Sequence, residues 1–208
     1  MLKVMLLTGM RISEVGGLCW SDVDYENDII HIRRALYSQY EYGERHLRFT
    51  TTKTINSVRD IPMMADCKKM LKLQKKNQDR IKKELGKRYR SEYEEGLSDL
   101  VFTSSMGSAA TRYNVAPIIN KIVQSINLRE DYESVQENRE PVYMKPVSPH
   151  ALRRSFCTRC FEAGMNIKVV QKIMGHNNYA TTANIYTEVM PDKMNEEIEL
   201  FNSKLLAL

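Results

Sequence analysis

The residues from Ser148 to Arg153 have the types and spacing that would bind a phosphate. Ser148 followed by Pro149 is a helix-start signal, with serine as the N-cap and proline at the first helical position. His150 would then lie in the first turn, where free backbone N–H groups and the helix dipole favour an anion. Arg153 comes three residues later, so its guanidinium shares a helix face with His150. Together these groups suit a phosphate.

A second histidine and a tyrosine extend this stretch. Gly175 is a predicted helix C-cap, which would leave His176 exposed in a loop. Tyr186 follows ten positions after His176. It is one of 11 tyrosines, so its identity alone carries no information. A phenol needs activation to act as a nucleophile, and nearby arginines can stabilise its phenolate.

Several motifs in the chain resemble those of the tyrosine recombinases, the phage integrase family. HALR, MGH and TTANIYTEV are similar to its C-terminal signature. In this family an arginine motif comes first, and TGMRISEVGGLCW supplies it through Arg11. A lysine on a β-hairpin follows, and TTKTINSVRDIPM supplies Lys53. A lone H-x-x-R would be weak, whereas separated motifs in the family's order over roughly residues 1 to 190 are a strong signal.

The resemblance implies a role for each matching residue. Tyr186 would attack the scissile phosphate of DNA, forming a 3′-phosphotyrosyl link and freeing a 5′-hydroxyl. Lys53 would protonate the departing 5′ oxygen, since an ammonium is mostly protonated at neutral pH. The arginines and histidines would hold the phosphate oxygens. No cofactor or metal is implied. The predicted catalytic residues are Arg11, Lys53, His150, Arg153, His176 and Tyr186.

Each of these residues also has a simpler interpretation. Arg11 can form a surface ion pair with Glu14, which we expect to hold the arginine motif in place. Lys53 can be an ordinary strand-edge lysine, with Arg48 and Arg59 as neighbouring alternatives, although guanidinium is a poor proton donor. The histidines can be a helix cap and a solvated loop residue. Two positions depart from the commonest family pattern, Met174 (usually leucine) and Glu188 (often histidine), and Glu188 alters the charge near the nucleophile.

Composition is compatible with this interpretation without requiring it. The 208 residues, with 42% hydrophobic and 27% charged residues, are typical of one globular domain. A net charge of +5 is compatible with nucleic acid. Cys157 and Cys160 have no second pair to complete a zinc site, and the four cysteines show no secreted disulfide spacing. We therefore expect a reduced, cytoplasmic protein without a membrane segment.

The predicted fold is α+β, mainly α-helical with a small three-stranded antiparallel sheet, as in the catalytic domains that the chain resembles. A buried helix should end at Gly9, and strands should run from Ile29 to Thr52, with a turn at Gly43, and from Ser57 to Pro62. Helices are expected over 66–90 and 111–126, an acidic loop over 129–140, and a tail helix over 191–208. Relatives of this family carry DNA-binding domains upstream, so we interpret residues 1–208 as one catalytic domain without them.

The function implied by the resemblance is that of a site-specific recombinase or integrase of a mobile element, such as a conjugative transposon or phage. Its partners would be double-stranded DNA, three further protomers in a synaptic tetramer, and an accessory protein of the excisionase type. The tail helix would dock on a neighbouring protomer, or on its own domain. A type IB topoisomerase, which rejoins the same strand, and a catalytically silent DNA-binding fragment are the alternatives.

Overall fold

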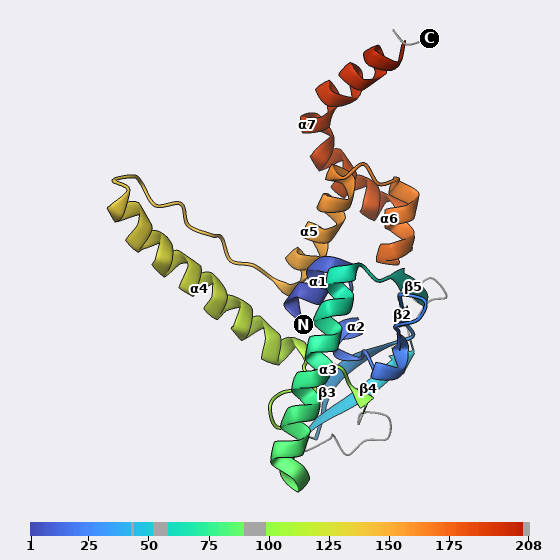
Figure 1. The fold of residues 1–208 in the computed structure, drawn as a ribbon, viewed down its shortest axis with the longest axis vertical. Coiled ribbons are helices and arrows are strands. Elements are labelled where there is room, and N and C mark those ends of the chain that lie inside the picture. Colours follow the sequence, from blue (N-terminus) through green and yellow to red (C-terminus); the bar gives the residue numbers. More distant parts are fainter. Residues whose placement is uncertain (43, 52–57, 90–98, 206–208) are drawn as a thin grey trace.

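The computed structural model describes residues 1–42, 44–51, 58–89 and 99–205. Figure 1 shows a helical body with strands on one side and two helices, α4 and α7, that extend away from it. The helices and strands are α1 (Leu2–Thr8), α2 (Ile12–Gly16), η1 (Trp20–Asp22), β1 (Val23–Asp24), β2 (Ile29–Ile32), β3 (Arg34–Glu41), β4 (Glu44–Thr51), β5 (Arg59–Pro62), α3 (Ala65–Leu85), η3 (Gly86–Arg88), α4 (Arg112–Gln136), α5 (Pro149–Glu162), α6 (Ile167–Met174) and α7 (Tyr179–Leu205).

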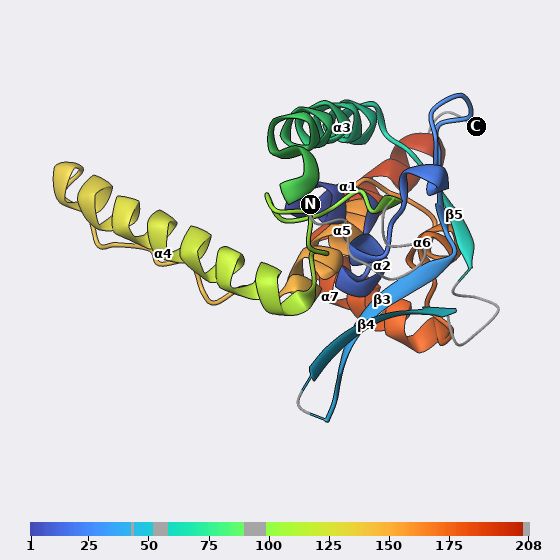
Figure 2. The ribbon, with the colours of Figure 1, turned by 90° about the horizontal axis from the view of Figure 1, so that it is seen from below.

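The strands form two antiparallel sheets. One has the order β1-β2-β5, with Ile30 opposite Ile61, and the other is the β3–β4 hairpin. A three-stranded antiparallel sheet is therefore present, but it consists of β1, β2 and β5, and β1 lies before Ile29, where we expected the strands to begin. The hairpin is a separate sheet that projects from the body in Figure 2. Lys53 lies outside the described residues.

The main core joins the first helices to the three-stranded sheet. Met5, Val15 and Ile30 are fully buried in it, together with Leu71 of α3. The prediction that α1 ends at Gly9 is confirmed, since Gly9 has a φ of 65° and donates its N–H to the carbonyl oxygen of Met5. A second hydrophobic cluster forms where α5, α6 and α7 meet. The N-terminal part of the predicted site therefore rests on the main core, and the C-terminal part rests on this second cluster.

Helix α4 is longer than predicted. We expected a helix over 111–126 and an acidic loop over 129–140, but the helix continues to Gln136. The chain returns antiparallel beside it, and Asn127 bonds both the N–H and the carbonyl oxygen of Met144. Arg139 pairs with Glu130, which offsets part of the acidic charge. These partners are distant in sequence, so local periodicity did not reveal the extension. Figure 2 shows α4 reaching away from the body.

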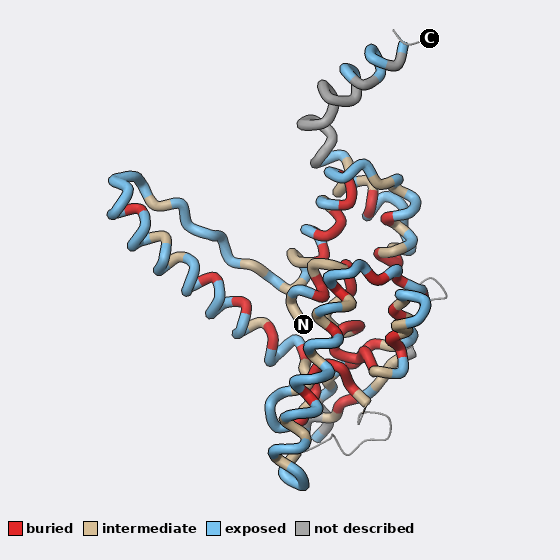
Figure 3. Tube along the Cα trace, in the orientation of Figure 1, coloured by how far each residue is buried: buried red, intermediate tan, exposed pale blue. Residues whose placement is uncertain are grey.

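Helix α7 was predicted as two segments and is one. It runs through Pro191, so the expected tail helix of 191–208 is the continuation of the helix that carries Tyr186. Figures 1 and 3 show this end of α7 leaving the body, and its described apolar side chains Ile198, Phe201 and Leu205 are 57%, 59% and 52% exposed. No helix in the described part of the chain is long and apolar enough to cross a membrane.

Candidate active site

A cavity of about 360 Å³ brings together three of the predicted catalytic residues. Arg11 precedes α2, while His150 and Arg153 come from α5. The predicted start of α5 is confirmed, since the Ser148 side chain accepts a hydrogen bond from the N–H of Ala151 at 3.2 Å. The full lining consists of Arg11, Ile12, Ser13, Arg112, Ser148, Pro149, His150 and Arg153.

The electrostatics of this cavity favour an anion. Its lining includes three guanidinium groups and a histidine, and no acidic side chain of the described chain contributes to it. The N-termini of α4 and α5 both open on it, because Arg112 and Pro149 are the first residues of their helices. Free N–H groups there add partial positive charge. A phosphate is the anion that this combination fits.

Arg153 is held rigidly although it is almost completely buried, with 1% exposed. Its Nη1 donates to the carbonyl oxygen of Gly9 at 2.6 Å, and its Nη2 donates to that of Met174. Its Nε–H has no partner among the described residues. Burial and the nearby charge of Arg11 lower the pKa of Arg153 to about 9, so it remains protonated at neutral pH. A bound anion would relieve both effects.

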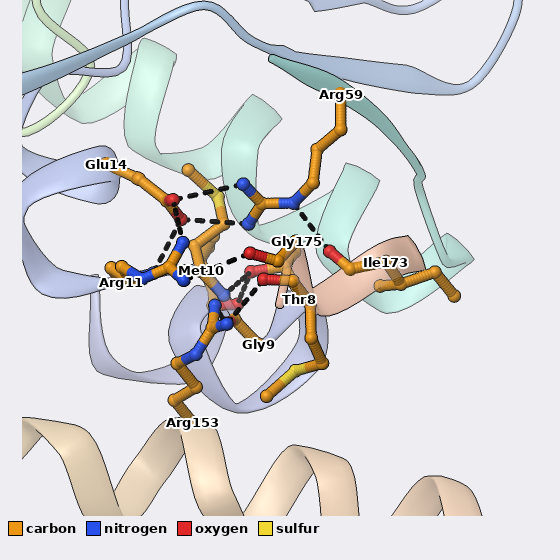
Figure 4. A network of polar contacts seen from close by, with 11 residues as sticks. Thr8, Gly9, Met10, Arg11, Glu14, Arg59, Arg153, Ile173 and Gly175 are labelled. Atoms are coloured by element: carbon orange, nitrogen blue, oxygen red, sulfur yellow. Dashed lines mark hydrogen bonds and ion pairs between the residues drawn. The ribbon is translucent and has the colours of Figure 1, made fainter. Parts of the chain in front are cut away.

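Arg11 makes the ion pair that we considered as its simpler interpretation, and it also lines the cavity. Nη1 lies 2.8 Å from Oε1 of Glu14, and Nη2 donates to the carbonyl oxygen of Gly175 at 3.1 Å. Its side chain is 37% exposed, whereas that of Glu14 is 2% exposed. A guanidinium has five N–H donors, so these two contacts leave donors for a ligand. Figure 4 shows Glu14 between Arg11 and Arg59.

His176 follows the predicted C-cap, Gly175, which is confirmed in the left-handed conformation with a φ of 62°. The histidine is half-buried rather than exposed, and its Nδ1 lies 2.9 Å from Oγ1 of Thr182. Burial, followed by the charges of Arg153 and Arg11, lowers the pKa of His176 to about 4. It is therefore neutral at neutral pH. It lines a second cavity, of about 480 Å³, with Arg59 and Gly175.

Tyr186 lies in α7 and does not line either of these two cavities. Its ring packs edge-on against Phe161, with the ring centroids 5.0 Å apart and the planes at 77°. It belongs to the cluster that covers α5 and α6, so it borders the site without entering it. On the exposed face beside it, Glu188 pairs with Arg154, which offsets the acidic charge that departs from the family pattern.

Sequence analysis missed two arginines at the site. Arg59 was considered only as an alternative to Lys53, yet it is buried and bonds both carboxylate oxygens of Glu14, at 3.0 and 2.9 Å. Arg112 was not considered, although the capping box of Thr111 and Asn114 marks a helix start at this point. Its convergence with α5 could not be inferred from that local signal.

Comparisons with known proteins assign the chain to a family. Residues 1–193 match the phage integrase family. The chain belongs to this family. A relative named tyrosine recombinase XerC-like, from Caldanaerobacter subterraneus subsp. tengcongensis, is 30% identical over 200 residues, which cover 94% of this chain and 46% of the relative. The transposase from transposon Tn916 of Enterococcus faecalis is 31% identical over 204 residues, covering 97% of this chain and 44% of that protein.

Solved structures of the family share the fold. The integrase of transposon Tn1549, in complex with circular intermediate DNA, superposes with a TM-score of 0.74 and 30% identity, covering 96% of this chain and 58% of that one. The same integrase in complex with transposon right end DNA has a TM-score of 0.72 and 29% identity, covering 94% of this chain and 57% of that one. This phage integrase family member spans about half the length of the curated relatives it matches.

Proposed function

We propose that this chain is the catalytic domain of a site-specific DNA recombinase of the integrase type, which cleaves and rejoins DNA through Tyr186. The observation that carries the proposal is the cavity where Arg11, His150 and Arg153 meet at the N-terminus of α5. An anion-binding site of this kind beside a tyrosine-bearing helix suits transfer of a phosphoryl group to a phenol. The integrase of Tn1549 was solved in complex with DNA, which supports DNA as the substrate.

In the proposed reaction the scissile phosphate occupies the cavity. Arg11 donates to its nonbridging oxygens, and the positive charge of Arg153 beside them helps to neutralise the charge that develops as phosphorus gains a fifth ligand. The Tyr186 oxygen forms a bond to phosphorus while the bond to the 5′ oxygen breaks. Lys53 supplies the proton that this leaving oxygen needs, and His150 accepts the proton that the Tyr186 hydroxyl loses.

The reverse reaction joins DNA without an external energy source. One phosphodiester bond is exchanged for one phosphotyrosyl bond, so the bond energy is retained until a 5′-hydroxyl attacks. When that hydroxyl comes from a partner duplex, the result is strand exchange. Integration or excision of a mobile element is the use that the relatives from transposons support.

The proposal requires α7 to deliver Tyr186. The phenol ring now rests against Phe161, in a cluster next to the cavity. A shift of the α7 segment that begins at Tyr179 would carry the hydroxyl to the phosphate, because His176 and Thr182 connect this segment to the site. Binding of DNA is the event that we expect to drive the shift.

We also propose that the active assembly contains four protomers on two duplexes, with an accessory protein of the excisionase type directing the reaction. The exposed Ile198, Phe201 and Leu205 of α7 support docking of this helix on a neighbouring protomer. We place the reaction in the cytoplasm, where the DNA of a mobile element and its bacterial target would be found.

A DNA substrate nicked close to the cleavage site tests the proposed function. Loss of the short nicked fragment prevents rejoining, so a recombinase accumulates a covalent protein–DNA adduct on a denaturing gel. Release onto a second duplex bearing a free 5′-hydroxyl then separates a recombinase from a topoisomerase, which rejoins its own strand. DNA binding without an adduct would mean that the chain is a binding module and would contradict the proposal.

A further inference from the structure

Arg59 occupies an unusual position for a charged side chain. It is the first residue of β5, six positions after Lys53, and only 4% of its side chain is exposed. A buried guanidinium is unfavourable unless its charge and donors are satisfied. Two of its partners come from other parts of the candidate site.

The first partner is Glu14, on the arginine motif. Nη1 and Nη2 of Arg59 donate to Oε1 and Oε2 of Glu14 at 3.0 and 2.9 Å, which is a bidentate pair. The same carboxylate accepts the backbone N–H of Arg11 at 2.8 Å and its Nη1 at 2.8 Å. Glu14 is thus shared by two arginines, as Figure 4 shows. Arg59 is buried, whereas Arg11 lines the cavity.

The second partner is the turn that carries His176. Nε of Arg59 donates to the carbonyl oxygen of Ile173 at 2.6 Å. A Cβ atom on Gly175 would lie 3.1 Å from Cδ of Arg59, so the absence of a side chain there allows this close approach. One guanidinium therefore connects β5, the arginine motif and the C-terminal turn of α6, which are far apart in the sequence.

The charges of Arg59, Glu14 and Arg11 explain why the contacts of Arg59 would help the site to bind a phosphate. Glu14 carries one negative charge, and without Arg59 its only cationic partner among the contacts described would be Arg11. A one-to-one ion pair would cancel the charge of Arg11 and hold its donors. With Arg59 present, the group of Arg11, Glu14 and Arg59 has a net charge of +1, and its exposed member faces the cavity.

We infer that Arg59 is a positioning residue for the reaction: it compensates Glu14, so that Arg11 remains available to the phosphate, and it fixes the turn before His176. The inference rests on the proposed function and adds a residue that does not itself touch DNA. Because β5 begins at Arg59, the same side chain also anchors this strand to the site.

The test compares Arg59→Met, Arg59→Lys, Glu14→Gln and the double variant Arg59→Met/Glu14→Gln. The matched control is Arg34→Met, which removes the ion pair of Arg34 with Asp22 at 3.1 Å, outside both cavities. Single-turnover cleavage of the nicked substrate is measured at saturating DNA, with the folded fraction from circular dichroism. Arg59→Met should slow cleavage about 30-fold or more, as loss of an electrostatic stabiliser does, while DNA affinity changes little.

The double variant separates positioning from simple support of the fold. Removing the uncompensated carboxylate should restore cleavage at least fivefold relative to Arg59→Met, since Arg11 is released. Arg59→Lys should cleave at an intermediate rate, because its charge remains and its bidentate geometry is lost. A double variant as slow as Arg59→Met, or Arg59→Met as fast as Arg34→Met, would overturn the inference.

An NMR titration of His176 in the free protein decides the matter independently of cleavage. Arg59→Met removes a nearby positive charge and loosens the turn, so the pKa of His176 should rise towards its ordinary value, whereas Arg34→Met leaves it unchanged. An unmoved pKa in folded Arg59→Met, or in folded Arg59→Gln if the methionine variant does not fold, contradicts the inference, because both replacements remove the positive charge. Absence of any adduct with the natural sequence would instead refute the proposed function.

Discussion

Nη2 of Arg11 donates a hydrogen bond to the carbonyl oxygen of Gly175 at 3.1 Å, although the two residues are 164 positions apart in the chain. The bond fixes the arginine motif near the start of the chain against the turn that carries His176. Arg153 completes the connection, because it donates to the carbonyl oxygens of Gly9 and Met174 on either side. The groups that we propose to bind the phosphate are therefore held by backbone oxygens in the free protein, which is the preorganisation that electrostatic catalysis requires.

Replacement of either cavity arginine by lysine should slow cleavage while the charge is kept. Arg11→Lys and Arg153→Lys lose the planar fork that can hold both a protein oxygen and a phosphate oxygen. We expect single-turnover cleavage to fall about 100-fold in each, the scale of losing one electrostatic donor. Near-normal rates in both variants, measured on the nicked substrate, would refute the phosphate-binding role. Arg34→Met serves again as the control, with its folded fraction measured by circular dichroism.

Arg112 should contribute to DNA affinity and not to the chemical step. It is exposed at the start of α4 and lines the cavity beside His150, a position that suits a phosphate next to the scissile one. Arg112→Ala should weaken DNA binding and reduce the slope of log Kd against log salt by about 1. Cleavage at saturating DNA should stay within about threefold. An unchanged salt slope would exclude a direct phosphate contact.

His176 should make the free protein less stable in mild acid. Its folded pKa is lowered to about 4, against about 6.5 in an unfolded chain, so the unfolded state binds more protons as the pH falls from 6.5 to 4. Stability is therefore lost progressively across this window, and His176→Gln should show a smaller loss. Denaturation at several pH values measures the difference. If the free energy of unfolding fell equally with pH in the two proteins, the lowered pKa of His176 would be contradicted.

DNA binding should raise the lowered pKa of His176. A bound phosphate offsets the positive charges of Arg153 and Arg11, which are the charged groups that lower the pKa of His176 most. The pKa of the histidine, followed by its ring proton signals, should rise in complex with DNA. The measurement is best made in Tyr186→Phe, so that no covalent bond forms during the titration. A pKa that stays at its free value would place the phosphate away from His176.

Truncation after Met190 should affect assembly more than folding. The described apolar residues of the removed segment, Ile198, Phe201 and Leu205, are more than half exposed, so their loss leaves no new apolar surface on the body. The melting temperature should change by less than about 2 °C, whereas synapsis of two duplexes on a native gel should be lost. A large fall in melting temperature would mean that the segment packs on its own domain.

Local signals in the sequence predicted the parts of the site that lie within one element. The start of α5 was marked by Ser148 and Pro149, and the C-terminus of α6 by Gly175. These signals sufficed because helix caps depend on neighbouring residues alone. The role of Arg59 and the length of α4 could not be predicted in this way. Both depend on partners distant in the chain, Glu14 with Ile173 in the first case and Met144 in the second.

The resting position of Tyr186 shows a further limit. Its spacing from His176 marked it as the nucleophile, but spacing carries no information on which way a ring turns in a helix bundle. The phenol ring packs against Phe161 because this contact buries two aromatic rings that would otherwise be exposed to water. Likewise, we expected a separate tail helix to begin at residue 191, yet α7 continues through Pro191.

The most direct test of the central claim is the identity of the residue that becomes attached to DNA. The nicked substrate is incubated with the protein, the adduct is digested with trypsin, and the peptide that carries the nucleotide is sequenced by mass spectrometry. The account predicts attachment through Tyr186 alone. It also predicts no adduct in Tyr186→Phe, with DNA affinity within about twofold because only a hydroxyl is lost. An adduct on another residue, Tyr179 included, or one that persists in Tyr186→Phe, would contradict the account.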